Sequence, residues 1–100
     1  MTVTIEIPHG PRGFAEDKDV ARNIRVSRVL PALEKGENVI LDFTNVIFAT
    51  QSFVHALIGQ ALKQYGEPVL DRIEFRNCSP QLRNIVDLVV DYSLGGFSAA

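Results

Sequence analysis

The sequence predicts an α/β fold in which about three helices pack on a small, mainly parallel or mixed β-sheet. Three observations support this prediction. Residues 2–7, 39–43 and 72–76 have the composition of strands, the stretches between them space their apolar residues as helices do, and those stretches are long enough to connect parallel strands. A chain of 100 residues has the size of one domain, so we expect a single domain over residues 1–100.

The three predicted strands differ in how their apolar residues are arranged. Residues 2–7 alternate polar with apolar side chains, which is typical of an edge strand with one buried face. Residues 39–43 form an almost unbroken apolar run, which predicts a central strand covered on both faces. Residues 72–76 alternate again and predict a short third strand. The prolines and glycines of residues 8–13 predict a loop after the first strand.

Three segments have helical character. The first begins near Asp17 and should bend at Pro31, because proline cannot donate the helical hydrogen bond to the preceding turn. The second, residues 51–65, has the clearest apolar face. The third should begin with Ser79 as its N-cap and Pro80 in the first helical position. We expect an ordered core of about residues 2–92 and a flexible tail over residues 93–100.

Composition argues against several classes of function. Ten basic and twelve acidic side chains leave a net charge of −2, and neither sign forms a run that could follow a phosphate backbone or an anionic membrane. The first residues lack the pattern of a signal peptide, and no apolar stretch is long enough to cross a bilayer. A single cysteine, Cys78, allows no internal disulfide. We therefore expect a cytoplasmic protein with no nucleic-acid or membrane partner.

The segment after the central strand carries the most informative pattern. Residues 42–45 read Asp-Phe-Thr-Asn at the strand end, and a hydrophobic stretch then leads to Thr50, Gln51, Ser52 and Phe53 at a helix start. This order resembles the central motif of STAS domains, the fold of bacterial anti-anti-sigma factors, and the order of elements agrees over about residues 2–92. In that family the loop typically reads Asp-Ser-Ser/Thr-Gly, so Thr50 stands in place of the acid and Phe53 in place of the glycine. The sequence is more similar to small bacterial STAS-like domains with Leu-Asp-Phe, Ser/Thr-Ser-Phe and an upstream Asp-Lys-Asp, as at residues 17–19.

The resemblance implies a regulatory role without enzymatic activity. STAS loops carry a serine or threonine that a partner kinase phosphorylates, which makes Ser52 the first phosphorylation candidate and Thr50 the second. The implied partner is a protein, for example an ATP-binding, kinase-like regulator, and a homo-oligomer is compatible with it. The expected binding surface comprises Thr44, Asn45, Thr50, Gln51, Ser52 and His55, with the neighbouring residues 77–79.

The local chemistry of the helix start allows two further interpretations. Its free backbone N–H groups and the helix dipole would stabilise a carboxylate or phosphate, so a small-molecule or nucleotide sensor could use the same place. Alternatively, Thr50 or Ser52 is an ordinary N-cap. No cofactor or metal is expected, because no P-loop, dinucleotide fingerprint or metal-ligand spacing is present.

Asp42 needs its own explanation, because a carboxylate in an apolar strand must find hydrogen-bond donors or have its pKa raised. The structural hypothesis is that it caps the following loop. The alternative is the phosphoacceptor of a receiver domain, with Glu16, Asp17 and Asp19 as metal-binding acids. The chain is short for that fold and has no lysine at a final strand end.

A small enzyme using Cys78 or Asp42 is the third class of function. Cys78 precedes a helix start, where the dipole could lower the pKa of its thiol. Arg83 follows after only four intervening residues, which does not fit a phosphatase loop. His55 could approach Ser52 on one helical face, but a solvated histidine is the simpler interpretation. Gly59 within the same helix predicts close packing against the sheet or a partner.

Overall fold

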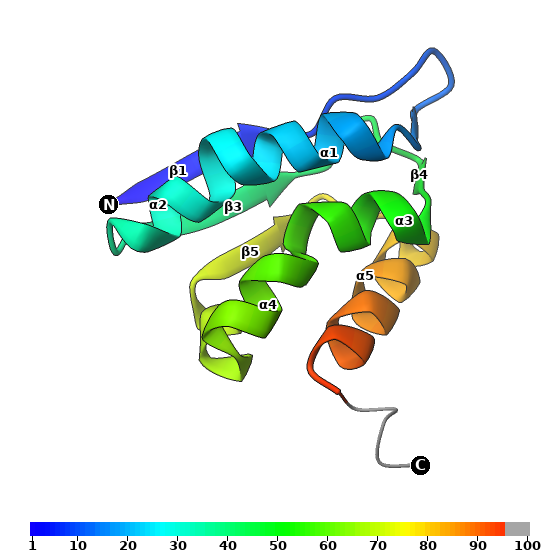
Figure 1. The fold of residues 1–100 in the computed structure, drawn as a ribbon. Coiled ribbons are helices and arrows are strands. Elements are labelled where there is room, and N and C mark those ends of the chain that lie inside the picture. The colour runs from blue at the N-terminus through cyan, green and yellow to red at the C-terminus, as the bar shows by residue number, and fades with distance from the viewer. Residues whose placement is uncertain (96–100) are drawn as a thin grey trace.

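The computed structural model describes residues 1–95 and has the expected α/β architecture (Figure 1). Its main sheet has three parallel strands in the order β1 (Thr2–Glu6), β3 (Asn38–Asp42) and β5 (Ile73–Arg76). A second parallel pair joins β2 (Phe14–Ala15) to β4 (Phe48–Ala49). The small parallel sheet is as predicted. The second pair was not predicted, because strands of two residues are too short to show a period.

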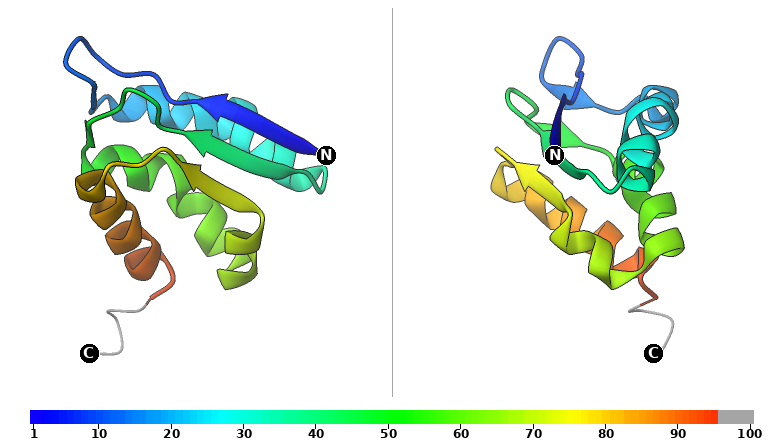
Figure 2. Two further views of the ribbon diagram at one scale, coloured as in Figure 1. Left: turned by 180° about the vertical axis from the view of Figure 1, so that it is seen from behind. Right: turned by 90° about the vertical axis from the view of Figure 1, so that its left-hand side faces the viewer.

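Helices cover one face of the main sheet and leave the other face open (Figure 2). On β3, Val39 and Leu41 point into the core and are buried, whereas Ile40 and Asp42 lie on the opposite side and are only half-buried. The prediction of a central strand is confirmed, but the prediction that both its faces are covered is wrong. Ile40 lies between Thr4 and Glu74 of the neighbouring strands, so its apolar side chain sits among polar neighbours rather than under a helix.

The first predicted helix is one helical segment with a change of register inside it. α1 (Lys18–Ile24) begins with Asp17 as N-cap, the π-helical turn η1 (Arg25–Val29) follows, and α2 (Leu30–Glu34) continues from it. The disturbance expected at Pro31 takes the form of this π turn directly before the proline, where the Leu30 N–H reaches back to the Arg25 carbonyl.

The second helical segment has the predicted bounds. It consists of α3 (Gln51–Val54), the π turn η2 (His55–Gly59) and α4 (Gln60–Tyr65). A 3₁₀ turn, η3 (Glu67–Asp71), leads from it into β5.

The last helix, α5 (Pro80–Ser93), starts with Ser79 as N-cap, as predicted. It ends at Ser93, whose side chain is buried, so the helix continues into the first residue of the expected tail. The last part of that tail, residues 96–100, lies outside the described residues.

The core lies between the sheet and the helices, and its largest fully buried side chains include Leu41, Phe43, Phe53, Leu57 and Leu82. Arg72 fixes the start of β5 against this layer. Its Nη2 donates hydrogen bonds to the carbonyls of Leu33 (2.8 Å) and Glu37 (2.9 Å). Both carbonyls lie near the end of α2, where cations interact favourably with the helix dipole.

Gly13 sets how closely the loop after β1 approaches the loop after β3. Its φ of 74° lies in the left-handed region, and its carbonyl accepts a hydrogen bond from the Ile47 N–H at 2.8 Å. A Cβ at this position would lie 2.7 Å from the carbonyl oxygen of Asn45. Only glycine fits there, because both the backbone angle and the contact exclude a side chain.

We predict that Gly13→Ala lowers the free energy of unfolding by about 3 kcal/mol, the sum of a left-handed backbone and an overpacked contact. The matched control is Gly36→Ala, since Gly36 has a φ of 80° but no atom within 4 Å of the added Cβ. That variant should lose only the backbone contribution of about 1–2 kcal/mol. Urea denaturation measures both, and equal losses would show that the approach to Asn45 is not a constraint.

Candidate functional site

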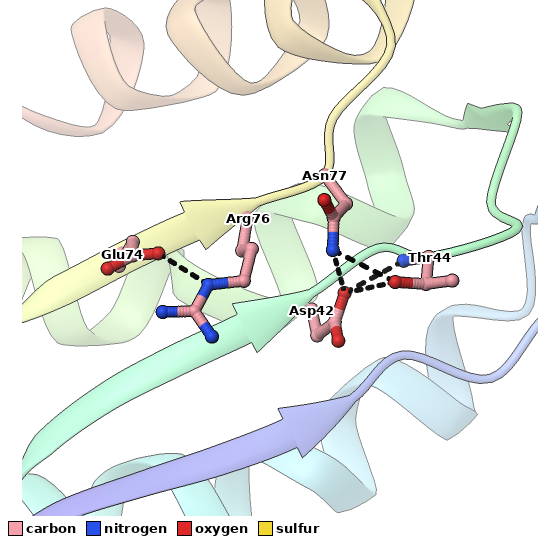
Figure 3. A network of polar contacts seen from close by, with 5 residues as sticks. All are labelled: Asp42, Thr44, Glu74, Arg76 and Asn77. Carbon is pink, nitrogen blue, oxygen red and sulfur yellow. Dashed lines mark hydrogen bonds and ion pairs between the residues drawn. The ribbon is translucent and has the colours of Figure 1, made fainter.

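The loops that follow β3 and β5 are joined by one carboxylate (Figure 3). Asp42 Oδ1 accepts hydrogen bonds from the Thr44 N–H (3.0 Å), the Thr44 hydroxyl (2.6 Å) and Asn77 Nδ2 (2.9 Å). Asn77 Nδ2 also lies 3.0 Å from Thr44 Oγ1. Thr44 comes from the first loop and Asn77 from the second, so the two expected loops do meet at this edge of the sheet.

These donors determine the protonation of Asp42. The hydrogen bond from the Thr44 hydroxyl, then that from Asn77 and then that from the Thr44 backbone lower the pKa of the Asp42 carboxyl, and the charge of Arg76 adds to them. Arg76 itself is paired with Glu74 at 2.7 Å. Of the two outcomes expected for a carboxylate here, the structure has the first: Asp42 has found donors and stays ionised.

A second link joins the same two loops further from the sheet. The Ser79 hydroxyl donates to the Ile47 carbonyl at 3.0 Å and accepts from the Leu82 N–H at 3.2 Å. The same side chain therefore caps α5 and holds the loop that precedes α3. Each loop also turns through an asparagine with positive φ, Asn45 at 65° and Asn77 at 62°. Asparagine tolerates this conformation better than most residues, which explains the residue type at both turns.

At the start of α3, Thr50 and Ser52 have different roles. Thr50 Oγ1 accepts a hydrogen bond from the Phe53 N–H at 3.1 Å, so Thr50 is the N-cap. Ser52 is exposed, and its hydroxyl makes no hydrogen bond within residues 1–95. Gln51 is exposed beside it. The structure thus leaves the Ser52 hydroxyl free for a partner or a modifying enzyme.

His55 is exposed, as expected, but it does not approach Ser52. A Cβ added at Gly59 would lie 2.9 Å from a carbon of the imidazole, so the ring packs over Gly59, one turn further along the helix. The nearest neighbour of a side chain at Gly59 within the chain would therefore be this ring.

Three apolar side chains, before this helix start and on the strand paired with β4, are exposed or half-buried and were not predicted from the sequence. Ile47 is 56% exposed and Phe14 is 42% exposed, while Phe48 is half-buried. The rings of Phe14 and Phe48 meet edge to face with centroids 6.0 Å apart, because the two residues pair across β2 and β4. We call Phe14, Ile47 and Phe48 the apolar patch. Their exposure depends on loop geometry, which carries no periodic signal.

The family of the chain follows from the segment that carries this arrangement. Residues 24–83, more than half of the chain, match the family described as a STAS-like domain of unknown function. The chain belongs to this STAS-like family. The matched segment includes β3, both loops, the helical segment with Ser52, and β5. No curated protein and no solved structure matches the chain.

The STAS-like domain also has an open groove of about 720 Å³ at the carboxyl ends of β1 and β3. Glu6 and Asp42 line it from the strands, Arg28 from η1, and Thr44 and Asn45 from the loop. Asp42, Thr44 and Asn45 were predicted site residues. Glu6 and Arg28 were not, because only the fold brings the ends of two strands to the side of a helix.

Two residues of the enzymatic and receiver-domain alternatives have defined surroundings in the structure: Cys78 is half-buried and Asp17 caps a helix. Burial raises the pKa of the Cys78 thiol, although Arg83 opposes this effect, so the thiolate is disfavoured rather than favoured by its position. Asp17 caps α1 by accepting from the Asp19 N–H. Within residues 1–95, no three His, Cys, Asp or Glu side chains lie where they could share a metal ion. No helix in this range is long and apolar enough to cross a membrane.

We predict that Asp42→Asn lowers the melting temperature at neutral pH and that the loss disappears in acid. The pKa of Asp42 is lower in the folded state than its ordinary value of 3.8. Its ionised form therefore stabilises the fold above pH 3.8, and this contribution is lost as the pH falls further, through the folded pKa. Thermal melts between neutral pH and about pH 2.5 measure the difference between wild type and variant.

Thr44→Val provides the control, since it removes the hydrogen bond that lowers this pKa most. In the Thr44→Val background, the pH-dependent part of the loss caused by Asp42→Asn should shrink. A loss that stays constant with pH would contradict a stabilising ionised carboxylate.

Proposed function

We propose that this STAS-like domain is a regulatory interaction module that docks a signalling protein and carries out no chemistry itself. Its docking surface comprises the loop of residues 44–52, the start of the helix after it, and the apolar patch. One observation carries the proposal: the segment from Ile47 to Ser52 exposes both a large apolar side chain and a serine hydroxyl without a hydrogen bond in residues 1–95, and Phe14 is exposed on the strand paired with it.

This combination resembles the composition of protein interfaces. Their centres are rich in aromatic and large apolar residues and are surrounded by polar groups. The apolar patch would supply the centre, with Thr44, Asn45, Gln51 and Ser52 as the polar surroundings. Single exposed apolar residues need no explanation, but here Phe14 and Ile47 are held together by β2, β4 and the contacts of Gly13.

The two links between the loops support docking without rearrangement. Asp42 fixes the beginning of the 44–52 loop, and Ser79 holds its middle at the Ile47 carbonyl. A surface that is already ordered loses less conformational entropy when a partner binds. The loop can therefore present Ile47 and Ser52 in one arrangement.

Phosphorylation of Ser52 would provide a switch. The phosphate would add between about 1.5 and 2 negative charges next to the apolar patch, at a helix start that tolerates negative charge. Folding should be little affected, because Ser52 is exposed and caps nothing. Docking should weaken, because the new charge would have to be desolvated in the interface. By family resemblance, an ATP-binding, kinase-like regulator is the partner class that fits both roles.

The groove supports a second candidate function, a small-ligand sensor, at a place that does not include the helix start expected for a sensor from the sequence. Arg28, Thr44 and Asn45 would hydrogen-bond a polar ligand there. The carboxylates of Glu6 and Asp42, which line the same groove, would disfavour a strongly anionic one. Native mass spectrometry of protein purified from its source cells tests this. A retained small molecule that is lost from Arg28→Glu protein would favour the sensor, and unliganded protein of the expected mass would disfavour it.

The docking proposal is tested first by substitutions on the proposed docking surface and measurement of the affinity for a captured partner. Wild-type protein serves as bait in the source cells, and the captured protein is then titrated against purified variants. We predict that Ile47→Asp weakens binding by about tenfold or more, as loss of a central apolar anchor does. Val26→Asp is the matched control, because Val26 on η1 is also 56% exposed but lies outside the docking surface. Equal effects of the two variants would contradict this docking surface.

The switch is tested at Ser52 and Thr50. We predict that Ser52→Ala keeps wild-type affinity and that Ser52→Asp weakens binding, with both melting temperatures unchanged. Thr50→Ala and Thr50→Asp are the controls. Thr50→Ala should lose about 1 kcal/mol of stability as an N-cap, with little change in affinity. Equal affinities of Ser52→Ala and Ser52→Asp would remove the switch.

A further inference from the structure

The main sheet has two edges, and only one of them is covered by the described part of the chain. At the β5 edge, α5 lies nearby: Arg83 of α5 is 5.7 Å from the centre of the Phe75 ring, and Val86 and Val90 line the same groove as Ile73. A second sheet brought against β5 would have to displace α5. At the other edge, β1 is the last strand of the order β1-β3-β5 in the described residues, and only the loop that follows it rises beyond it, at its carboxyl end (Figures 1 and 2).

The free edge of β1 presents a regular set of hydrogen-bonding groups. The Met1 carbonyl and the Ile7 N–H, at the two ends of β1, both bond to β3. The backbone N–H and C=O groups of successive residues point to alternate sides of a strand, so those of Val3 and Ile5 also point toward β3. The N–H and C=O groups of Thr2, Thr4 and Glu6 therefore point away from the sheet.

This edge lacks most of the features that usually prevent strands from pairing. It is five residues long and contains no lysine, no proline and no bulge. Its residues Thr, Val and Ile are among those that favour strands most. Glu6 is the only charged side chain of β1, and it lies at the end of the strand.

We propose that β1 pairs with β1 of a second copy of this chain, antiparallel and with Thr4 on the two-fold axis. Two three-stranded sheets would then form one sheet of six strands. This register pairs all five residues: Thr4 meets Thr4 of the partner copy, Val3 meets Ile5, and Thr2 meets Glu6. The proposal rests on β1 alone and does not depend on the docking surface.

The side chains are compatible with this pairing. Val3 and Ile5 lie on the core side, so their contact would cover the half-exposed Val3. The single charge, Glu6, would face the uncharged Thr2. A register with Glu6 on the axis would instead place two carboxylates opposite each other, which is unfavourable. Because α5 covers the β5 edge, pairing through β1 closes at two copies and cannot extend into a fibre.

The interface is short, so the dimer should be weak and reversible. Stable dimers bury about 800 Å² per partner, which is more than a five-residue edge provides alone. We expect a monomer–dimer equilibrium visible at high micromolar concentration.

Sedimentation velocity over a concentration series tests the proposal. It compares two threonine-to-lysine variants, both on the exposed face of β1. Thr4→Lys places two lysines opposite each other on the axis, so Kd for dimerisation should rise by about threefold or more. Thr2→Lys places each lysine opposite Glu6 of the partner copy, so Kd should fall by about threefold or more. Circular dichroism checks that both variants are folded, and both shifts should diminish in high salt.

Opposite shifts from the two lysines support the Thr4 register, and changes of the same sign would overturn it. A double variant, Thr2→Lys with Glu6→Lys, should lose the tighter dimerisation of Thr2→Lys, and keeping it would also overturn the register. If wild-type and Thr2→Lys proteins are both monomeric at every concentration, the proposal is overturned entirely. Species larger than a dimer would show that the β5 edge also pairs and would overturn the closed assembly.

Discussion

The hydrogen bonds to Asp42 are the interaction on which the arrangement of the site depends. One carboxylate oxygen is shared by the backbone and side chain of Thr44 and by the amide of Asn77. The chain leaves β3 and β5 at neighbouring positions, and this common acceptor ties the two loops together at the sheet edge. Because three donors surround the charge, ionisation is stabilising there, and a carboxylate at the end of an apolar strand is structurally useful.

In and around the loop held by Asp42, some side chains make hydrogen bonds that stabilise the fold, and their neighbours are exposed and make none. Thr50 uses its hydroxyl to cap α3, and Ser79 uses its hydroxyl to cap α5 and to hold Ile47. Ser52 and the Ile47 side chain take no part in these bonds. In the proposed function, a phosphate or a bound protein at Ser52 would act on the surface without breaking the structure that positions it. Such a division suits a switch whose input should change docking and leave folding intact.

Local sequence signals predicted most of the fold. The start of the first helix near Asp17, the N-cap at Ser79, the helix over residues 51–65 and the central position of β3 all follow from patterns of a few residues. The open face of β3 could not be predicted in this way. The apolar run that includes Ile40 is the same whether a helix or polar side chains lie beside that residue.

The apolar patch was missed for a related reason. Phe14 belongs to β2 and Ile47 to the loop before β4, and these segments are joined by the Ile47–Gly13 hydrogen bond and by the pairing of β2 with β4. Site residues within one motif were predictable, whereas contributions from a second segment required the fold.

The most direct test is made at this patch, by site-specific photo-crosslinking in the source cells, because the crosslinked adduct itself identifies the partner. A benzophenone amino acid replaces Ile47 in one protein and Val26, an equally exposed residue of η1, in another. The account predicts a light-dependent adduct with a second kind of protein from position 47 only, and a lower yield of it when Ser52 is also changed to Asp. Adducts of equal yield from both positions, or none from position 47, would contradict a docking surface at the 44–52 loop.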